Sequence, residues 1–96
     1  MSPDAIAQER REECRRTVLE HLVGRSHVAC HPQDIRRALN AGRAHDFDLE
    51  EVVSALAFLV MSSPQLATTV RDPMGATVYY QATAAGVLHH ERGGRA

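Results

Sequence analysis

The sequence predicts a mainly helical α+β domain, and three observations support that class. The chain has 96 residues, enough for one hydrophobic core and too few for two. Its composition, 44% hydrophobic and 24% charged, is that of an ordinary globular protein. Apolar residues recur with the helical period in three stretches, and with a period of two between residues 66 and 82. We therefore expect a single domain over residues 1–91, with residues 92–96 as a disordered tail.

A first helix is expected from Pro3 to about Val23. Ser2 can cap its free N–H groups, and proline is favoured at the first helical position. Gly24 then supplies the stop. Residues 8–16 are nearly all charged with alternating signs, which predicts a solvated helix face. Five apolar side chains of the second half form one stripe: Cys14, Val18, Leu19, Leu22 and Val23.

A short extended segment over residues 26–31 is expected before a second helix. Pro32 and Asp34 mark the start of that helix, and Gly42 marks its end. Three of its side chains are expected to face inward and join the core: Ile35, Ala38 and Leu39.

The third helix has the clearest pattern in the chain. Asp48 and Glu51 have the spacing of a capping box, and the helix is expected to run to about Met61. A turn of about 100° per residue places six apolar side chains on one inward face: Leu49, Val52, Val53, Leu56, Leu59 and Val60. The outward face is expected to consist of Glu51, Ser54, Ala55, Phe58 and Ser62.

After the third helix the pattern changes from the helical period to a period of two, with Leu66, Thr68 and Val70 on one side, followed by Val78, Tyr80 and Ala82. Residues 66–70 and 78–82 are expected to be two strands. Between them, residues 72–75 read Asp-Pro-Met-Gly, which is typical of a type I turn or a slightly longer hairpin loop and predicts an antiparallel hairpin. Thr83 is expected to cap a last short helix over residues 84–90.

This order of elements resembles the winged helix-turn-helix superfamily. The segment from Leu66 to Gly86, with residues 79–86 as Tyr-Tyr-Gln-Ala-Thr-Ala-Ala-Gly, is similar to the wing and the Tyr-x-x-Thr-x-x-Gly exit of many small bacterial regulators. The resemblance covers most of residues 10–90. It implies a three-helix core and a DNA-binding module: the third helix enters the major groove, the second helix and its turn contact phosphates, and the wing reaches the neighbouring groove or backbone.

The resemblance implies a small transcriptional regulator, for which arginines supply the candidate DNA contacts. All 11 basic residues are Arg and the formal net charge is −1, so DNA contacts require a local basic patch. Residues 24–45 hold four arginines against one acid, Asp34. The expected DNA-binding residues are Arg36, Arg37, Arg43, His45, Arg71 and Thr77.

A second hypothesis keeps the fold and turns the third helix toward a protein partner. Its expected outward face carries no Arg, Lys, Asn or Gln to read base edges, and acidic residues crowd its start. An exposed Phe58 next to Ala55 would suit a protein interface. The alternative is that the first or last helix of the same chain covers Phe58. The expected interface residues are Glu51, Ser54, Ala55 and Phe58.

Other functions have weaker support in the sequence. His27, Cys30 and His31 lie close together, but without the spacing of paired zinc ligands, so we expect no metal and no other cofactor. Neither a Gly-rich phosphate loop nor a nucleophile elbow occurs, and no enzyme is expected. Two cysteines and no long apolar span predict a cytoplasmic protein without a membrane partner. A homodimer is expected under either hypothesis.

Overall fold

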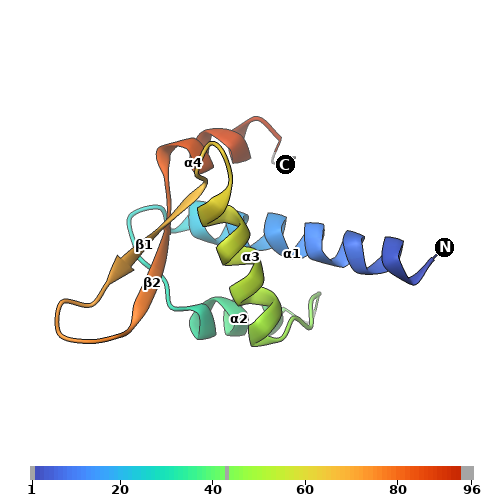
Figure 1. Ribbon diagram of the computed structural model, residues 1–96, viewed down its shortest axis with the longest axis horizontal. Helices are drawn as coiled ribbons and strands as arrows, with labels where there is room; N and C mark the ends of the chain where they lie inside the picture. Colours follow the sequence, from blue (N-terminus) through green and yellow to red (C-terminus); the bar gives the residue numbers. More distant parts are fainter. Residues whose placement is uncertain (1, 43, 94–96) are drawn as a thin grey trace.

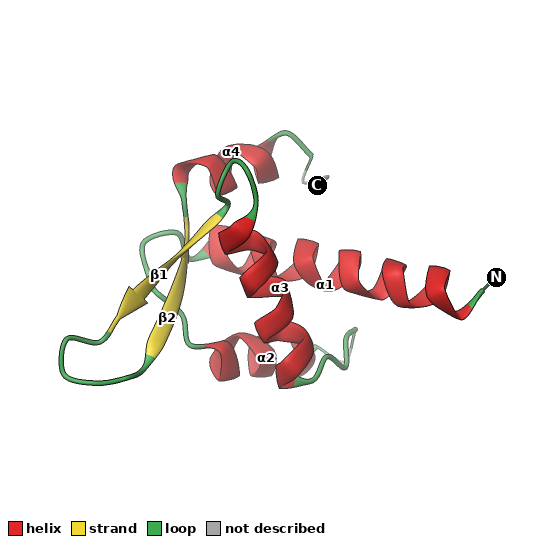
Figure 2. Cartoon of the chain, viewed as in Figure 1, coloured by secondary structure: helices red, strands yellow, loops and turns green. Residues whose placement is uncertain are grey.

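The computed structural model describes residues 2–42 and 44–93. Its elements follow one another as α1 (Pro3–Gly24), α2 (Pro32–Ala41), α3 (Leu49–Met61), β1 (Ala67–Arg71), β2 (Val78–Ala82) and α4 (Ala84–Glu91). This part of the chain is mainly helical with one two-stranded antiparallel sheet, which confirms the α+β class (Figure 2). Arg43 and residues 94–96, the end of the expected tail, lie outside the described residues.

Helix α1 lies along the longest axis of the molecule, and its N-terminal half projects past the other elements (Figure 1). Helix α3 crosses α1 and packs against α1, α2 and β1. The hairpin lies at the opposite end from the start of α1, and α4 returns to pack on α1 (Figure 1). The core therefore forms where the second half of α1 meets α2, α3 and the hairpin.

The predicted stripe of α1 forms one wall of the core. Cys14, Val18, Leu19 and Leu22 are at most 3% exposed, and Val23 packs against them while partly buried. No described residue with a polar or charged side chain is buried, so the core is apolar throughout. Its other members are Cys30, Ile35, Phe47, Val52, Ala55, Leu56, Leu59, Leu66, Ala67 and Ala82.

The predicted helix starts are confirmed by their caps. Ser2 Oγ and Thr83 Oγ1 each accept a hydrogen bond from the N–H three residues along, at 3.3 and 3.0 Å. At the start of α3, Asp48 Oδ1 accepts from the Glu51 N–H at 2.8 Å, and Glu51 Oε1 accepts from the Asp48 N–H at 3.1 Å. These bonds occupy N–H groups that have no partner within the helix.

Strands β1 and β2 form the predicted antiparallel hairpin, with Ala67 opposite Ala82. The extended segment predicted over residues 26–31 is shorter than expected, because the chain turns immediately after α1. It is reduced to one bridge to β2. Here the Cys30 N–H donates to the Tyr80 carbonyl at 2.7 Å, and the Tyr80 N–H donates to the Cys30 carbonyl at 2.8 Å.

Helix α2 contributes less to the core than the sequence suggests. Ile35 is fully buried and Leu39 is partly buried, as predicted, but Ala38 is exposed. The inward placement of Ala38 is therefore wrong. The reason is that this short helix packs mainly against α1 and α3, and Ile35 and Leu39 supply its contacts with the core.

Helix α3 is turned about its axis relative to the predicted orientation. Leu49 and Val53, expected inside, are 38% and 40% exposed, whereas Ala55, expected outside, is 3% exposed. The reason is the position of α1, which packs on the Ala55 side of α3. Cys14 Sγ lies there 3.6 Å from the Glu51 carbonyl oxygen, and the small Ala55 side chain permits this close approach.

Candidate functional site

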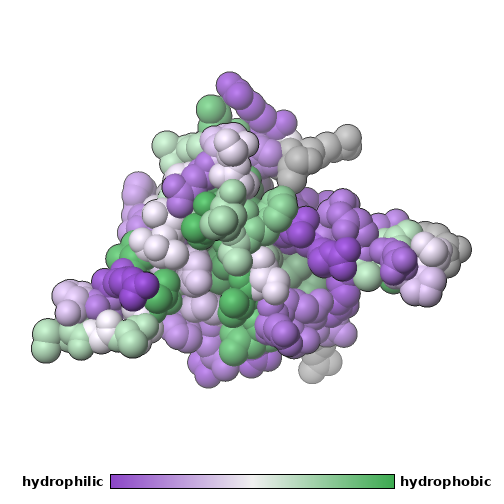
Figure 3. All heavy atoms as spheres, viewed as in Figure 1, coloured by the Kyte–Doolittle hydropathy of each residue, from purple (hydrophilic) through white to green (hydrophobic). Residues whose placement is uncertain are grey.

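The exposed side of α3 carries a line of apolar residues. We call the exposed residues of this helix the α3 face: Leu49, Glu50, Val53, Ser54, Ala57 and Met61. Every fourth residue along it is apolar, and because four residues turn the helix by about 400°, successive members are offset by about 40° and form a row inclined to the helix axis. We call this the apolar line: Leu49, Val53, Ala57 and Met61, of which Met61 is 82% exposed. Figure 3 shows hydrophobic side chains gathered along α3.

The apolar line exists because α3 has more apolar side chains than the core takes up. Its buried side is already filled by four residues: Val52, Ala55, Leu56 and Leu59. A surface helix ordinarily carries polar residues on the opposite side. Contiguous exposed apolar surface is typical of interaction sites, whereas single exposed apolar residues are common everywhere. The α3 face is therefore the strongest candidate for a functional surface in the described part of the chain.

The N-terminal end of the α3 face is acidic. Residues 46–51 contain four acids, Asp46, Asp48, Glu50 and Glu51. Asp46 is 89% exposed, and Glu50 makes no ion pair within the part of the chain that the structure describes. Acids at a helix start are favoured by the helix dipole. The face thus combines an acidic end with an apolar length.

Arg10 of α1 offsets part of this charge. Its Nε donates to Glu51 Oε2 at 2.6 Å, and its terminal nitrogen donates to Glu51 Oε1 at 3.0 Å and to Asp46 Oδ1 at 3.1 Å. The guanidinium carbon also lies 5.2 Å from the centre of the Phe47 ring. The hydrogen bond from Arg10 lowers the pKa of Glu51, and the same pair raises the pKa of Arg10. Arg10 therefore ties the middle of α1 to the start of α3.

The residues expected at a protein interface lie mainly on the other flank of α3, against α1. Phe58 is half-buried there, with the Arg15 guanidinium carbon 3.7 Å from the centre of its ring. Coverage by the first helix was one of the alternatives for Phe58. Ala55 is buried and Glu51 is held by Arg10, so only Ser54 of the expected set belongs to the α3 face.

Of the arginines expected to contact DNA, those that the structure describes lie on α2 and in the hairpin, and Arg43 lies outside the described residues. Arg36 is partly buried, and its Nε donates to Gln33 Oε1 at 2.8 Å. Arg37 has a side chain that is 69% exposed. Arg71 is exposed at the end of β1, and Thr77 is partly buried at the other end of the same turn. These side chains come from two separate elements of the molecule.

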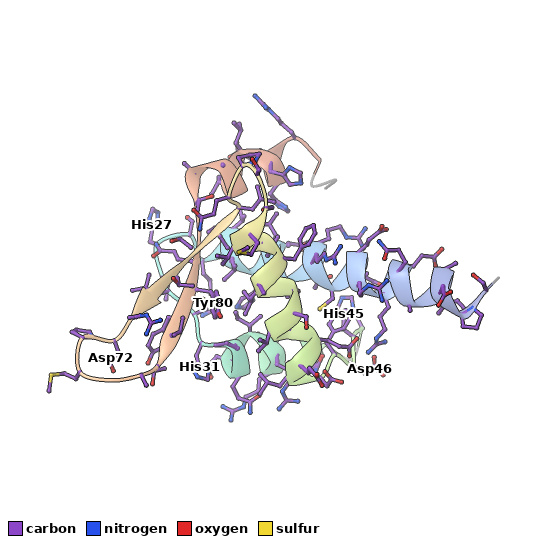
Figure 4. The ribbon with its side chains drawn as sticks, in the orientation of Figure 1. His27, His31, His45, Asp46, Asp72 and Tyr80 are labelled. Carbon is purple, nitrogen blue, oxygen red and sulfur yellow. The ribbon has the colours of Figure 1, made fainter. Side chains whose placement is uncertain are left out.

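His45 lies in the loop between α2 and α3, next to α1. Its ring stacks on Phe47, with ring centres 5.0 Å apart, and its Nδ1 is 3.8 Å from Glu13 Oε1 of α1. Figure 4 places His45 and Asp46 beside α1, on the other side of α3 from the hairpin. His45 therefore lies next to α1, whereas Arg36 and Arg37 belong to α2 and Arg71 belongs to the hairpin.

The cysteines and the neighbouring histidine have structural environments. Burial raises the pKa of the Cys14 thiol to about 11 and also raises that of Cys30, so both thiols are protonated and unreactive at neutral pH. His31 Nδ1 accepts from the Gln33 N–H at 3.1 Å and caps α2. Among residues 2–42 and 44–93, no cluster of three His, Cys, Asp or Glu side chains could hold a metal ion.

A groove of about 620 Å³ lies between α1, α3 and α4. Its apolar floor includes Leu19 and Phe58, and charges of both signs line its walls. Arg16 lies 3.9 Å from Glu13 in one wall, so the charges largely offset one another. The groove therefore has no convergent set of polar groups of the kind that orients a small ligand.

Comparisons with known proteins assign no family to the chain. No protein-family model, curated protein or solved structure matches it. Within the described residues, no helix has the length and apolar character to span a membrane. The function is therefore inferred from the geometry of the chain itself.

Proposed function

We propose that this chain is a protein-interaction module with a winged-helix arrangement, and that the α3 face is its binding surface. The observation that carries the proposal is the apolar line, exposed along the whole length of α3. Removing apolar surface from water contributes about 25 cal/mol per Å². A partner that covers this line therefore gains binding energy at a place where the chain itself provides no cover.

The order and pairing of the elements support the winged-helix part of the proposal. Three helices precede an antiparallel hairpin, and α4 follows it. The bridge between Cys30 and Tyr80 adds a minimal third strand beside β2. In the superfamily that this order resembles, the third helix is the one presented to a partner. In this chain, the partner of the third helix is a protein.

The chemistry of the α3 face favours a protein over DNA. Ser54 supplies a single hydroxyl, and no member of the face is Arg, Lys, Asn or Gln, the residues that read base edges. Glu50 and Asp46 would face the phosphates of any DNA bound to the start of α3. The exposed Arg37 and Arg71 make DNA binding the alternative that an experiment has to test.

A pair of matched substitutions tests the proposal. Val53→Asp places a charge in the middle of the apolar line, at a side chain that is 40% exposed. Val28→Asp makes the same change at a 54% exposed valine in the loop after α1. Wild type, V28D and V53D each serve as bait in affinity capture from a lysate of the cells that naturally produce this protein. We expect captured proteins that bind wild type and V28D but not V53D. Both variants should keep the unfolding free energy within about 0.5 kcal/mol of wild type, as surface changes do.

DNA binding is measured on the same proteins. A labelled mixed-sequence duplex is titrated at about 50 and 200 mM salt, and we expect no salt-sensitive change in anisotropy. Binding that weakens with salt, with a slope reduced in the Arg36→Ala, Arg37→Ala double variant, would assign the chain to DNA instead. Equal capture by V53D and V28D would also contradict the proposal.

A further inference from the structure

We infer that strand β1 binds an extended segment of another protein, which joins the sheet as an added strand and places an Asp or Glu opposite Arg71. This surface is separate from the α3 face, so the inference goes beyond the proposed function and does not depend on it. It follows from the hydrogen bonds of the hairpin, the exposure of β1 and the charge of Arg71.

The pairing of β2 determines which backbone groups of β1 are free. The N–H and the carbonyl of Tyr80 both bond to Cys30, on the side of β2 away from β1. Thr69 lies opposite Tyr80, and the two therefore share no hydrogen bond across the hairpin. Successive residues of a strand direct their backbone groups to opposite sides. Thr69 and Arg71 thus direct theirs away from β2, whereas Val70 bonds to β2.

This edge of β1 is open at one stretch. Thr69, Val70 and Arg71 are all exposed, and the hairpin loop extends past the helices (Figure 1). Within residues 2–42 and 44–93, no hydrogen bond reaches the groups that Thr69 and Arg71 direct outward. At the start of the strand Ala67 is fully buried, and beyond its end Pro73 has no N–H to donate. The open edge therefore consists of the backbone groups of Thr69 and Arg71.

An extended chain is the partner that satisfies these groups. Thr69 and Arg71 each offer one donor and one acceptor, two residues apart along a straight edge. A neighbouring strand presents its own donors and acceptors at the same spacing. A helix uses these groups in its own hydrogen bonds and cannot supply them along its length. In strand addition, the main chain provides affinity and the alternating side chains provide specificity.

The side chains of β1 determine which extended segment fits. Arg71 forms no ion pair within the part of the chain that the structure describes. Opposite charges directly across neighbouring strands are favourable, so an Asp or Glu opposite Arg71 is favoured. Val70 points to the other face of the sheet, beside Tyr79, and is 39% exposed. An apolar residue adjacent to the acid would cover Val70, so the segment alternates acidic and apolar side chains.

A second copy of this chain does not supply such an acid. No Asp or Glu occurs in its extended segments, which lie within residues 26–31, 62–71 and 76–83. The carboxylate nearest in sequence, Asp72, accepts from the Met74 N–H inside the hairpin turn. The other acids lie in helices or in the loop before α3, where the backbone of Phe47 bonds to Asn40.

The pairing of two β1 edges is also unfavourable. Antiparallel pairing through the free groups sets Thr69 of each copy opposite Arg71 of the other. The two Arg71 side chains then lie diagonally on one face of the sheet, about 7–8 Å apart, where like charges repel each other. A segment of a different protein, with an acid at this position, replaces that repulsion by an attraction.

Peptide selection tests the inference. A display library of random peptides of about 10 residues is selected on wild type and depleted on Thr69→Pro, which removes a free N–H at an edge position. We expect enriched peptides in which Asp or Glu adjoins an apolar residue. Their affinity should fall about tenfold or more for Arg71→Glu. It should stay unchanged for Arg37→Glu, the same charge change at a 69% exposed side chain of α2. Exchanging the acid of the peptide for Lys should restore binding to R71E.

Amide hydrogen exchange locates the bound peptide and does not depend on how T69P folds. The N–H groups of Thr69 and Arg71 should become protected when the peptide binds. The N–H of Val70 already bonds to β2, so its protection should change little. V53D should bind the peptides as wild type does, because Val53 belongs to the α3 face.

Each other outcome contradicts the inference. Peptides that are sensitive to T69P but not to R71E would refute the acidic partner. Peptides that leave the N–H groups of Thr69 and Arg71 unprotected would refute strand addition. If V53D also abolished their binding, the α3 face would be their site, which supports the proposed function alone. Protection of these two groups that rises with protein concentration without peptide would show that a second copy is the occupant.

Discussion

The guanidinium carbon of Arg15 lies 3.7 Å from the centre of the Phe58 ring, and this contact partly covers the flank of α3 that faces α1. A cation over an aromatic face is attracted by the negative charge of the ring face, by about 0.5–1 kcal/mol where water still reaches the pair. Phe58 is therefore occupied within the chain, although the sequence alone offered it as an anchor for a partner. The side of α3 that remains open is the one with the apolar line.

The contribution of this contact can be measured with a double-mutant cycle. Arg15→Ala and Phe58→Leu, alone and together, are expected to show a coupling of about 0.5–1 kcal/mol in urea unfolding. Arg16→Ala combined with Phe58→Leu is the matched control, because Arg16 lies next in sequence and pairs weakly with Glu13 instead. An equal coupling in both cycles would show that the ring contact adds nothing specific.

A second prediction concerns the close approach of α4 to the start of the hairpin. A Cβ on Gly86 would clash severely with the backbone oxygen of Leu66, which is a fixed atom. Gly86→Ala is therefore expected to destabilise the protein by about 1–3 kcal/mol, despite the better helix propensity of alanine. Gly24→Ala is the control, since no heavy atom outside its own neighbourhood lies within 4 Å of the added Cβ. Thermal unfolding of the two variants compares them directly, and equal midpoints would contradict the close packing.

Features that depend on nearby residues could be predicted from the sequence. The capping box of Asp48 and Glu51 and the hairpin turn at residues 72–75 are set by side chains within a few positions of one another. The stripe of α1 could also be predicted, because the rest of that helix is charged and leaves one apolar side. In each of these cases, residues close together in the sequence were sufficient to predict the structural feature.

The orientation of α3 could not be predicted in the same way. Apolar side chains extend around most of this helix, so periodicity alone did not distinguish the buried side from the apolar line. The outcome depends on where α1 packs, which is decided by Ala55 and by Arg15 over Phe58. A signal was present in the regular spacing of Leu49 and Val53, but the same spacing also fits a core. The sequence therefore indicated α3 as a candidate surface, but not which of its sides the chain leaves exposed.

The pair of Arg10 and Glu51 predicts how stability depends on pH. The hydrogen bond from Arg10 holds the pKa of Glu51 below its ordinary value of 4.5. A carboxyl whose pKa is lower in the folded state stabilises that state fully above its unfolded pKa, and loses the effect as the pH falls through its folded pKa.

Glu51→Gln keeps a side chain that can cap α3 but removes the charge. We expect this variant to have a lower urea midpoint than wild type at pH 7, with a difference that shrinks below about pH 4.5. Glu50→Gln changes an adjacent carboxylate without an ion pair among the described residues, and its difference from wild type should stay nearly constant over the same range. If the difference in urea midpoint between E51Q and wild type is the same at pH 3 as at pH 7, the ion pair with Arg10 does not contribute to stability.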